Sequence, residues 1–285
     1  MKLLSFVMEG RPSYGAVKDQ GVVDLGAQFG VQGCVTLRQL LESGRLPEAA
    51  EIAETAPADH ALAAITFAPV IPDPGKIICV GLNYRDHVAE VGRAVTEKPA
   101  LFARFPTSQV GHLQPIVRPR VSDHFDYEGE LALVIGRRGR HIRRADALAH
   151  VAGYSCYNEG SVRDWQRHTT QFLSGKTFDQ SGSFGPWLVT TDEIPDPGKL
   201  RLQTRLNGER VQNTAIDLLI TDIPDLIAYC STIMTLLPGD VIVTGTPGGV
   251  GLKRNPPLFM KPGDTVEVEI SGIGVLRNPV AAEPE

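Results

Sequence analysis

The chain has 285 residues and a mass of 30.8 kDa, which allows one or two domains. Its 42% hydrophobic and 21% charged residues are typical of a globular protein and exclude disordered or collagen-like chains. A net charge of −5 leaves no broad basic face, so we expect no nucleic-acid partner.

The cysteines and the apolar runs of the sequence indicate where in the cell the protein is expected. Four cysteines are widely separated and form no C-x-x-C pair, which favours a reducing compartment, and we expect a cytoplasmic protein. No small-residue cleavage site follows the first apolar run, so we expect no signal peptide. The longest uncharged apolar run, residues 226–237, is too short to span a bilayer, and we expect no membrane partner.

Residues 1–70 are predicted to form a small N-terminal α/β domain. Short strands are expected at 2–8, 14–18 and 21–25, and turn residues separate them. Helical patterns follow from Thr36, a predicted N-cap, and over residues 47–56. The turn-forming stretch 71–76 precedes a new apolar run, so we place the domain boundary between residues 70 and 71.

Residues 71–285 are predicted to be a strand-rich second domain with short helices at 84–91, 159–168 and 223–235. Two glycine-rich patterns in it fail as nucleotide sites. Gly175-Lys176-Thr177 lacks the earlier glycine of a P-loop, because Thr170 stands at that position. The stretch 245–251 follows a predicted strand, but the prolines at 256 and 257 prevent a helix from following it. The serine-hydrolase elbow and the zinc-protease helix motif are both absent.

Two glutamates lie in the acidic half of a predicted strand over residues 125–136. Because side chains two apart share a face of a strand, Glu128 and Glu130 point the same way. Two carboxylates beside a buried apolar run repel each other and resist desolvation, and a bound Mg²⁺, Mn²⁺ or Ca²⁺ would relieve both costs. The alternative is an exposed glutamate pair on an edge strand.

A second polar group follows at residues 157–166. In a helix beginning at Glu159, Arg163 and Gln166 would share its face, which brings an oxygen ligand, a guanidinium and an amide together. A solvated Glu-Arg pair is the alternative. Lys176 stands among glycines and Phe178, a setting that suits a partly buried ammonium as well as an ordinary surface lysine.

The third group is a histidine with a glutamate three residues later. In a short helix, Glu90 would orient the imidazole of His87 and raise its basicity, as a general base requires. An exposed helix carrying the same two residues is the alternative.

Together these segments resemble the fumarylacetoacetate hydrolase family from about Lys76 to Pro279. The motifs that carry the resemblance occur in this order: VGLNY at 80–84 with His87 and Glu90, PALF at 99–102, PTS at 106–108, YEGEL at 127–131, GY at 153–154 through Arg163-Asp164, GKTFD at 175–179 and TGTPGGVG at 244–251.

The resemblance implies a divalent metal, usually Mg²⁺ or Mn²⁺, on Glu128, Glu130 and Glu159. Family members usually carry aspartate at the third position, so Glu159 is a departure. Its additional methylene can shift the ion or leave a water between the ion and the carboxylate.

The resemblance also implies roles for other residues. His87 and Glu90 would form a dyad on a mobile lid, and Lys176 would be a further catalytic residue. The implied substrate contacts are Arg163, Gln166, Thr246 and Arg104, the last at a position where some relatives have lysine. The implied fold is a β-rich α+β structure, a mixed β-sandwich roll with a small N-terminal domain, usually homodimeric.

Our leading expectation for function is a Mg²⁺- or Mn²⁺-dependent hydrolase that cleaves a carbon-carbon bond in an acylpyruvate-type 2,4-dioxo acid. It would act through a pyruvate enolate in aromatic compound catabolism. The alternative is a decarboxylase or isomerase of a 2-oxo or 2-hydroxy-diene diacid such as oxaloacetate. The His87-Glu90 dyad favours water activation over isomerisation. A further alternative is a metal-stabilised binding protein without activity.

Overall fold

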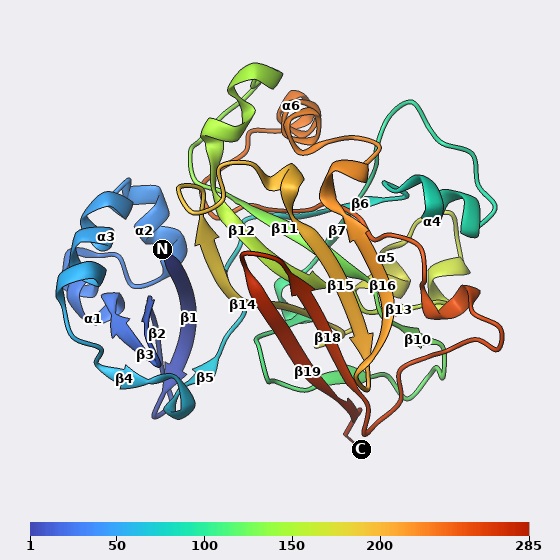
Figure 1. Cartoon of the computed structure of the whole chain (residues 1–285), viewed down its shortest axis with the longest axis horizontal. Coiled ribbons are helices and arrows are strands. Elements are labelled where there is room, and N and C mark those ends of the chain that lie inside the picture. The colour runs from blue at the N-terminus through green and yellow to red at the C-terminus, as the bar shows by residue number, and fades with distance from the viewer. Residues whose placement is uncertain (285) are drawn as a thin grey trace.

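Two facing β-sheets with short helices around them make up residues 1–284, the part of the chain that the computed structural model describes (Figure 1). The main path of the larger sheet runs through β4 (His60–Ala61), β3 (Gly21–Asp24), β2 (Arg11–Lys18), β1 (Lys2–Met8), β14 (Gly182–Thr190), β12 (Val151–Asn158), β11 (Gly129–Ile135), β17 (Val241–Val243), β6 (Ile77–Gly81) and β7 (Ala100–Arg104). Beside this path, β5 (Thr66–Phe67) pairs with β1, and β8 (Gln109–Val110) pairs with β14.

The smaller sheet lies across the larger one, in front of it in Figure 1. Its order is β16 (Glu209–Ala215), β15 (Arg201–Leu206), β18 (Thr265–Ile270), β19 (Gly274–Ala282) and β9 (Ile116–Arg118). A separate antiparallel pair joins β10 (Phe125–Asp126) to β13 (Ser161–Val162).

The helices are short. The α-helices are α1 (Leu25–Phe29), α2 (Leu37–Ser43), α3 (Leu46–Thr55), α4 (Arg85–Glu90), α5 (Leu173–Lys176) and α6 (Ile223–Ile233). The 3₁₀ helices are η1 (Gly30–Gln32), η2 (Leu62–Ala64), η3 (Pro106–Ser108), η4 (Arg144–His150), η5 (Trp165–Arg167), η6 (Pro197–Lys199), η7 (Ile216–Leu218) and η8 (Gly251–Lys253). Within residues 1–284, no helix has both the length and the apolar composition needed to cross a membrane.

Both faces of β11 are buried, which explains its unbroken apolar sequence after the glutamates. Leu131 and Leu133 face a core that includes Leu202 of the smaller sheet. Ala132 and Val134 face the opposite way, into a core that includes Leu40 of α2. The strand that carries the acidic cluster is therefore held between two apolar layers.

Most of the predicted elements are confirmed. The three N-terminal strands correspond to β1, β2 and β3, and Thr36 caps α2 through a reciprocal capping box with Gln39. The helices expected at 84–91 and 223–235 correspond to α4 and α6. The β-rich α+β class is confirmed. The division at residues 70 and 71 stays a prediction, and β1 pairs directly with β14 across it.

The helix predicted at residues 159–168 is wrong. Ser161 and Val162 form β13 instead, because they pair antiparallel with Asp126 and Phe125 of β10. Only a 3₁₀ turn, η5, remains of the expected helix. The pairing partner lies more than thirty residues earlier in the chain, so local periodicity could not reveal it.

Candidate functional site

Three buried glutamates meet where β11 and β12 lie side by side. Glu128 immediately precedes β11, Glu130 is its second residue, and Glu159 directly follows β12. The antiparallel register pairs Gly129 with Asn158, and the Glu159 N–H donates to the Glu128 carbonyl at 2.8 Å. One oxygen from each carboxylate lies within 4.8 Å of the others. The solvated-strand alternative is excluded, since these residues are 3%, 1% and 1% exposed.

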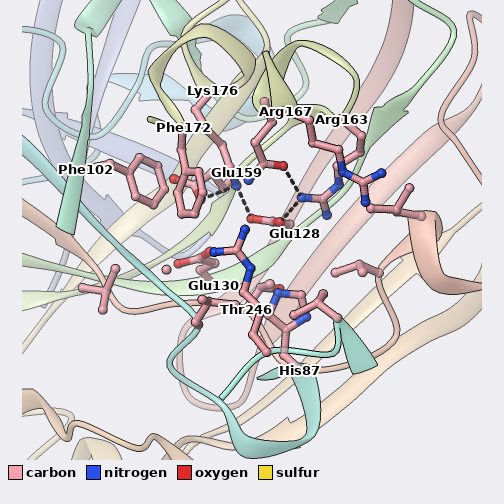
Figure 2. Close-up of a pocket in the computed structure, with 18 of the residues that line it drawn as sticks. His87, Phe102, Glu128, Glu130, Glu159, Arg163, Arg167, Phe172, Lys176 and Thr246 are labelled. Carbon is pink, nitrogen blue, oxygen red and sulfur yellow. Dashed lines mark hydrogen bonds and ion pairs between the residues drawn. The ribbon is translucent and has the colours of Figure 1, made fainter. Parts of the chain in front are cut away.

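Two buried cations contact this cluster (Figure 2). The Lys176 ammonium donates to Glu128 Oε2 at 2.5 Å and to Glu159 Oε2 at 2.8 Å. Arg163 Nη1 lies 2.6 Å from Glu128 Oε1. Arg163 Nε donates to Asp126 Oδ2 at 2.8 Å. Lys176 is 2% exposed, so the partly buried ammonium is the correct one of the two alternatives left open at this position, and the surface lysine is wrong.

The carboxyl pKa values diverge because their neighbours differ. Burial would raise the pKa of Glu128, but the Lys176 and Arg163 charges hold it well below its usual range. Burial raises the pKa of Glu130, and the nearby Glu159 and Glu128 charges raise it further, although the Gly245 N–H donates to its Oε2 at 2.5 Å. Glu130 is thus the carboxyl in greatest need of an additional positive charge.

The residues present fit a divalent cation. Glu159 Oε1 is buried and has no hydrogen-bond donor among residues 1–284. The cluster has four carboxylates, on Asp126 and the three glutamates, and two cations, Lys176 and Arg163. This leaves a formal excess of two negative charges, which one divalent ion would balance. Clustered carboxylate oxygens are the donors that Mg²⁺ and Mn²⁺ prefer.

The predicted His-Glu pair is present on α4. His87 Nδ1 lies 3.3 Å from Glu90 Oε2, and His87 is 6% exposed. A carboxylate can only accept, so Nδ1 donates to Glu90, and in the neutral ring Nε2 is the nitrogen left to act as a base. Burial would raise the pKa of Glu90, but the bonds from His87 and from the Gly249 N–H lower it. The Gly248 N–H donates to Asp86 at 3.2 Å, so the glycine-rich loop anchors α4 at two points.

Thr246 lies in the same loop, beside the cluster. Its hydroxyl donates to the Gly129 carbonyl at 3.0 Å and accepts from Gln212 Nε2 at 2.9 Å. The loop is thereby fixed against β11 at the residue between the two glutamates of the strand.

Arg104 is the predicted substrate contact that the structure does not bring into the cavity lining. It is 2% exposed, and its guanidinium donates to Ser108 Oγ, the Gly160 carbonyl and Ser181 Oγ at 3.2, 3.1 and 2.8 Å. It therefore lies behind the cluster and fixes the turn that follows Glu159.

A cavity of about 330 Å³ opens above the acidic cluster. That volume is near the lower end of ligand pockets and suits a small substrate. The predicted residues that line it are His87, Glu128, Glu130, Glu159, Arg163, Gln166, Lys176 and Thr246. Four lining residues that the sequence interpretation missed are Arg93, Phe102, Arg167 and Phe172. Arg93, Arg167 and Phe172 lie outside the family motifs. Phe102 lies inside one of them, but that motif gives no indication of what the side chain does.

Residues 76–281 match the sequence profile described as fumarylacetoacetate (FAA) hydrolase C-terminal. The chain belongs to the fumarylacetoacetate hydrolase family. The chain is 43% identical to human oxaloacetate tautomerase FAHD2A, mitochondrial, with 91% of this chain and 84% of the human protein covered.

Two solved structures of the family support the fold. The fumarylacetoacetate hydrolase of Exiguobacterium antarcticum is 36% identical, with a TM-score of 0.83 over 99% of this chain and 100% of that one. The maleylpyruvate hydrolase of Sphingobium sp. SYK-6, in complex with manganese(II) and pyruvate, is 29% identical, with a TM-score of 0.83 and full coverage of both chains.

These comparisons correct one expectation and confirm others. The cytoplasmic location is contradicted, because the human relative is designated mitochondrial. The expectation of an enzyme is confirmed, and a divalent metal agrees with both the manganese-bound relative and the acidic cluster. A hydrolytic reaction, aromatic catabolism and the homodimer stay predictions.

Proposed function

We propose that the protein is a divalent-metal-dependent isomerase that interconverts the keto and enol forms of a small 2-oxo diacid, with oxaloacetate as the first candidate. The observation that carries this proposal is the similarity to a human oxaloacetate tautomerase over 91% of the chain. The small cavity with its acidic floor supports the same choice, because a 2-oxo acid presents adjacent oxygens to a cation. The isomerase alternative is thus preferred over our leading expectation of hydrolysis.

We assign the metal to Glu128, Glu130 and Glu159, with Mg²⁺ or Mn²⁺ as the ion and Ca²⁺ as a further alternative. When bound, the ion supplies Lewis-acid stabilisation of negative charge on the oxygen of a 2-oxo acid. Lys176 holds Glu128 and Glu159 in place through its two hydrogen bonds.

Tautomerisation moves one proton from C3 of the keto form and places one on the C2 oxygen, without adding water or electrons. His87 lines the cavity, and its free Nε2 is the base that takes the C3 proton, since Nδ1 is engaged by Glu90. Thr246, Gln166 and Arg163 supply polar contacts that hold the substrate. The Arg163 Nη1 bond to Gln166 Oε1 at 3.0 Å aligns these two side chains.

Hydrolysis of an acylpyruvate is the second candidate. The buried His87-Glu90 dyad suits deprotonation of water as well as of carbon. The structural relative that was solved with manganese and pyruvate is a hydrolase of maleylpyruvate.

The test follows enol-oxaloacetate by its ultraviolet absorbance, with protein, Mg²⁺ and a heat-inactivated protein control. Mass spectrometry of the same reactions, and of reactions with an acylpyruvate, detects pyruvate and released acid. We expect accelerated tautomerisation that chelation abolishes and Mg²⁺ or Mn²⁺ restores. No acceleration over the control would reject the proposal, and pyruvate from the acylpyruvate would establish the hydrolase.

The assignment of His87 as the base is tested with the variant His87→Ala. Replacing the base should lower the tautomerisation rate by roughly two to four powers of ten. His87→Ala should bind Mn²⁺ in calorimetry as the wild type does, because His87 is not one of the clustered carboxylates. A fully active His87→Ala protein would contradict the assignment of the base.

A further inference from the structure

The cations that line the cavity fall into two classes. Lys176 and Arg163 are buried, and both are engaged by carboxylates of the acidic cluster. Arg93 and Arg167 are exposed, and no ion pair joins either of them to an acidic residue among residues 1–284. The cavity therefore has an acidic floor that needs a cation and two guanidinium groups on its wall that are available to an anion.

Arg93 is held at this wall by backbone and aromatic contacts. Its N–H donates to the Val88 carbonyl at 3.0 Å, which closes the chain back onto α4. Its guanidinium lies over the Phe172 ring, 5.7 Å from the centroid. The Phe172 ring packs edge-on against Phe102 with centroids 5.6 Å apart. The aromatic pair thus gives the side chain a defined position while leaving the N–H groups at its edge free to donate.

Arg167 approaches the cavity from a different element. It is the last residue of η5, and its N–H donates to the Asp164 carbonyl at 3.0 Å. The same turn carries Gln166, so Arg167 directly follows a predicted substrate contact. In Figure 2, Arg167 lies on the side of the pocket where Arg163 lies, and His87 lies on the opposite side.

We propose that Arg93 and Arg167 form the subsite for the distal carboxylate of the substrate and thereby select 2-oxo diacids over 2-oxo monoacids. This inference rests on the proposed function, which places the 2-oxo acid group at the acidic floor. A second carboxylate brought into the cavity must be paired to offset its desolvation, and an unengaged guanidinium pairs with it through two parallel hydrogen bonds.

The other basic residues of the region cannot serve this purpose. Lys176 and Arg163 already offset the glutamates, and moving either one away to a distal carboxylate would leave a buried carboxylate unpaired. Arg163 can contact the substrate only from its present position, through Nη2, which has no partner among residues 1–284. Arg104 lies outside the cavity lining and donates to two hydroxyls and a carbonyl.

The experiment compares two ligands that differ only at the distal end. Oxaloacetate carries a carboxylate where 2-oxobutanoate carries a methyl group, so the ratio of their dissociation constants isolates the distal contact. Calorimetry with saturating Mg²⁺ would measure both ligands on the wild type, Arg93→Gln, Arg167→Gln and the double variant. Arg138→Gln is the matched control, because Arg138 is exposed and lies beyond the end of β11 that is remote from Glu130.

We expect the wild type to bind oxaloacetate about a hundredfold more tightly than 2-oxobutanoate, about tenfold from each guanidinium. Each single replacement should reduce this preference by about tenfold, the double replacement should abolish it, and binding of 2-oxobutanoate should change by less than about threefold. Arg138→Gln should leave the ratio unchanged. A double variant with lysine at both positions keeps the charge without the planar fork and should retain part of the preference.

The outcomes separate this inference from the proposed function. A wild type with no preference, or a double glutamine variant that keeps it, would overturn the diacid subsite even if tautomerase activity were present. A preference that depends on both arginines would support the subsite even if the wild type failed the tautomerase assay. If circular dichroism shows that a glutamine variant does not fold, the double lysine variant tests the subsite instead. A ratio of dissociation constants equal to that of the wild type in the double lysine variant would reject the bidentate contact.

Discussion

Lys176 occupies two of the carboxylates to which we assign the metal. Its ammonium bonds Glu128 and Glu159, and burial, which would lower its pKa, is outweighed by these two carboxylates, which raise it. The lysine thus stabilises the cluster when no cation is bound and limits how much a bound cation adds. This double role makes position 176 a sensitive point at which to test the metal site.

We predict that Lys176→Met lowers stability without metal but increases the stabilisation that metal provides. Breaking a buried ion pair from one side costs about 3–5 kcal/mol, because Glu128 and Glu159 lose their counter-charge. Mn²⁺ should then raise the unfolding midpoint more in the variant than in the wild type, since the cation replaces the missing charge. Thermal unfolding with Mn²⁺ and with chelator measures both effects.

The control is Lys76→Met, which removes a lysine bonded at 2.7 Å to the buried Asp240, a residue outside the cavity lining. It should destabilise the protein and leave the midpoint increase from Mn²⁺ as in the wild type. An increase in Lys176→Met that is equal to or smaller than that of the wild type would contradict the proposed competition.

At single positions, the sequence could predict which side chains lie together when they are close in the chain. Strand alternation places Glu128 and Glu130 on one face, and helical spacing brings His87 beside Glu90, whereas their roles were implied by the family resemblance. Arg104 was expected in the cavity but bonds to residues far along the chain, such as Gly160 and Ser181. Contacts of that range are set by tertiary packing, which no local pattern records.

At the scale of elements, the hairpin of β11 and β12 positions the acidic cluster, and β7 supports it from behind through Arg104. The Arg104 bond to the Gly160 carbonyl fixes the turn that carries Glu159, and its bond to Ser181 ties that turn to the segment before β14. No carboxylate pairs with this buried guanidinium within residues 1–284, so its contribution is geometric.

We therefore predict that Arg104→Met weakens Mn²⁺ binding by about tenfold, because supporting residues around metal ligands set ligand orientation. The rate constant kcat at saturating Mn²⁺ should stay close to the wild-type value, since Arg104 does not line the cavity. Calorimetric titration with Mn²⁺ and steady-state kinetics separate the two quantities. Arg104→Lys keeps the charge but cannot reach three acceptors and should be intermediate. Wild-type affinity in Arg104→Met would show that Gly160 needs no such support.

The elements around the acidic cluster show which secondary structure the sequence could predict and which it could not. The apolar half of β11 was predicted because its seven residues are all buried and uniformly apolar after Glu130. The segment after Glu159 was misassigned to a helix, because β13 depends on its pairing with β10. The consequence for the site is small, as Arg163 and Gln166 remain in contact through the 3.0 Å bond.

Across the whole molecule, the N-terminal segment is joined to the smaller sheet through His112. The imidazole packs edge-on against Phe67 of β5 with centroids 4.9 Å apart, and Nδ1 accepts the backbone N–H of Arg277 in β19 at 3.1 Å. Burial, together with the charge of Arg277, lowers the pKa of His112 from 6.5 to about 4. The folded protein therefore holds His112 neutral, and a proton on Nδ1 would remove the acceptor.

The sign of the pH effect follows from the lowered pKa. Because the unfolded chain takes up the proton near pH 6.5 and the folded chain only near pH 4, the contribution of His112 is complete above pH 6.5 and is lost as the pH falls toward 4. We predict a loss of about 2 kcal/mol between about pH 7 and pH 5 from this residue. In His112→Asn, where the amide oxygen can accept the same N–H without titrating, urea unfolding should show a loss smaller by that amount. His141→Asn, at an exposed histidine, should behave as the wild type does. If His112→Asn lost as much stability as the wild type between about pH 7 and pH 5, the neutral His112 would not be the contact that joins the N-terminal segment to the smaller sheet.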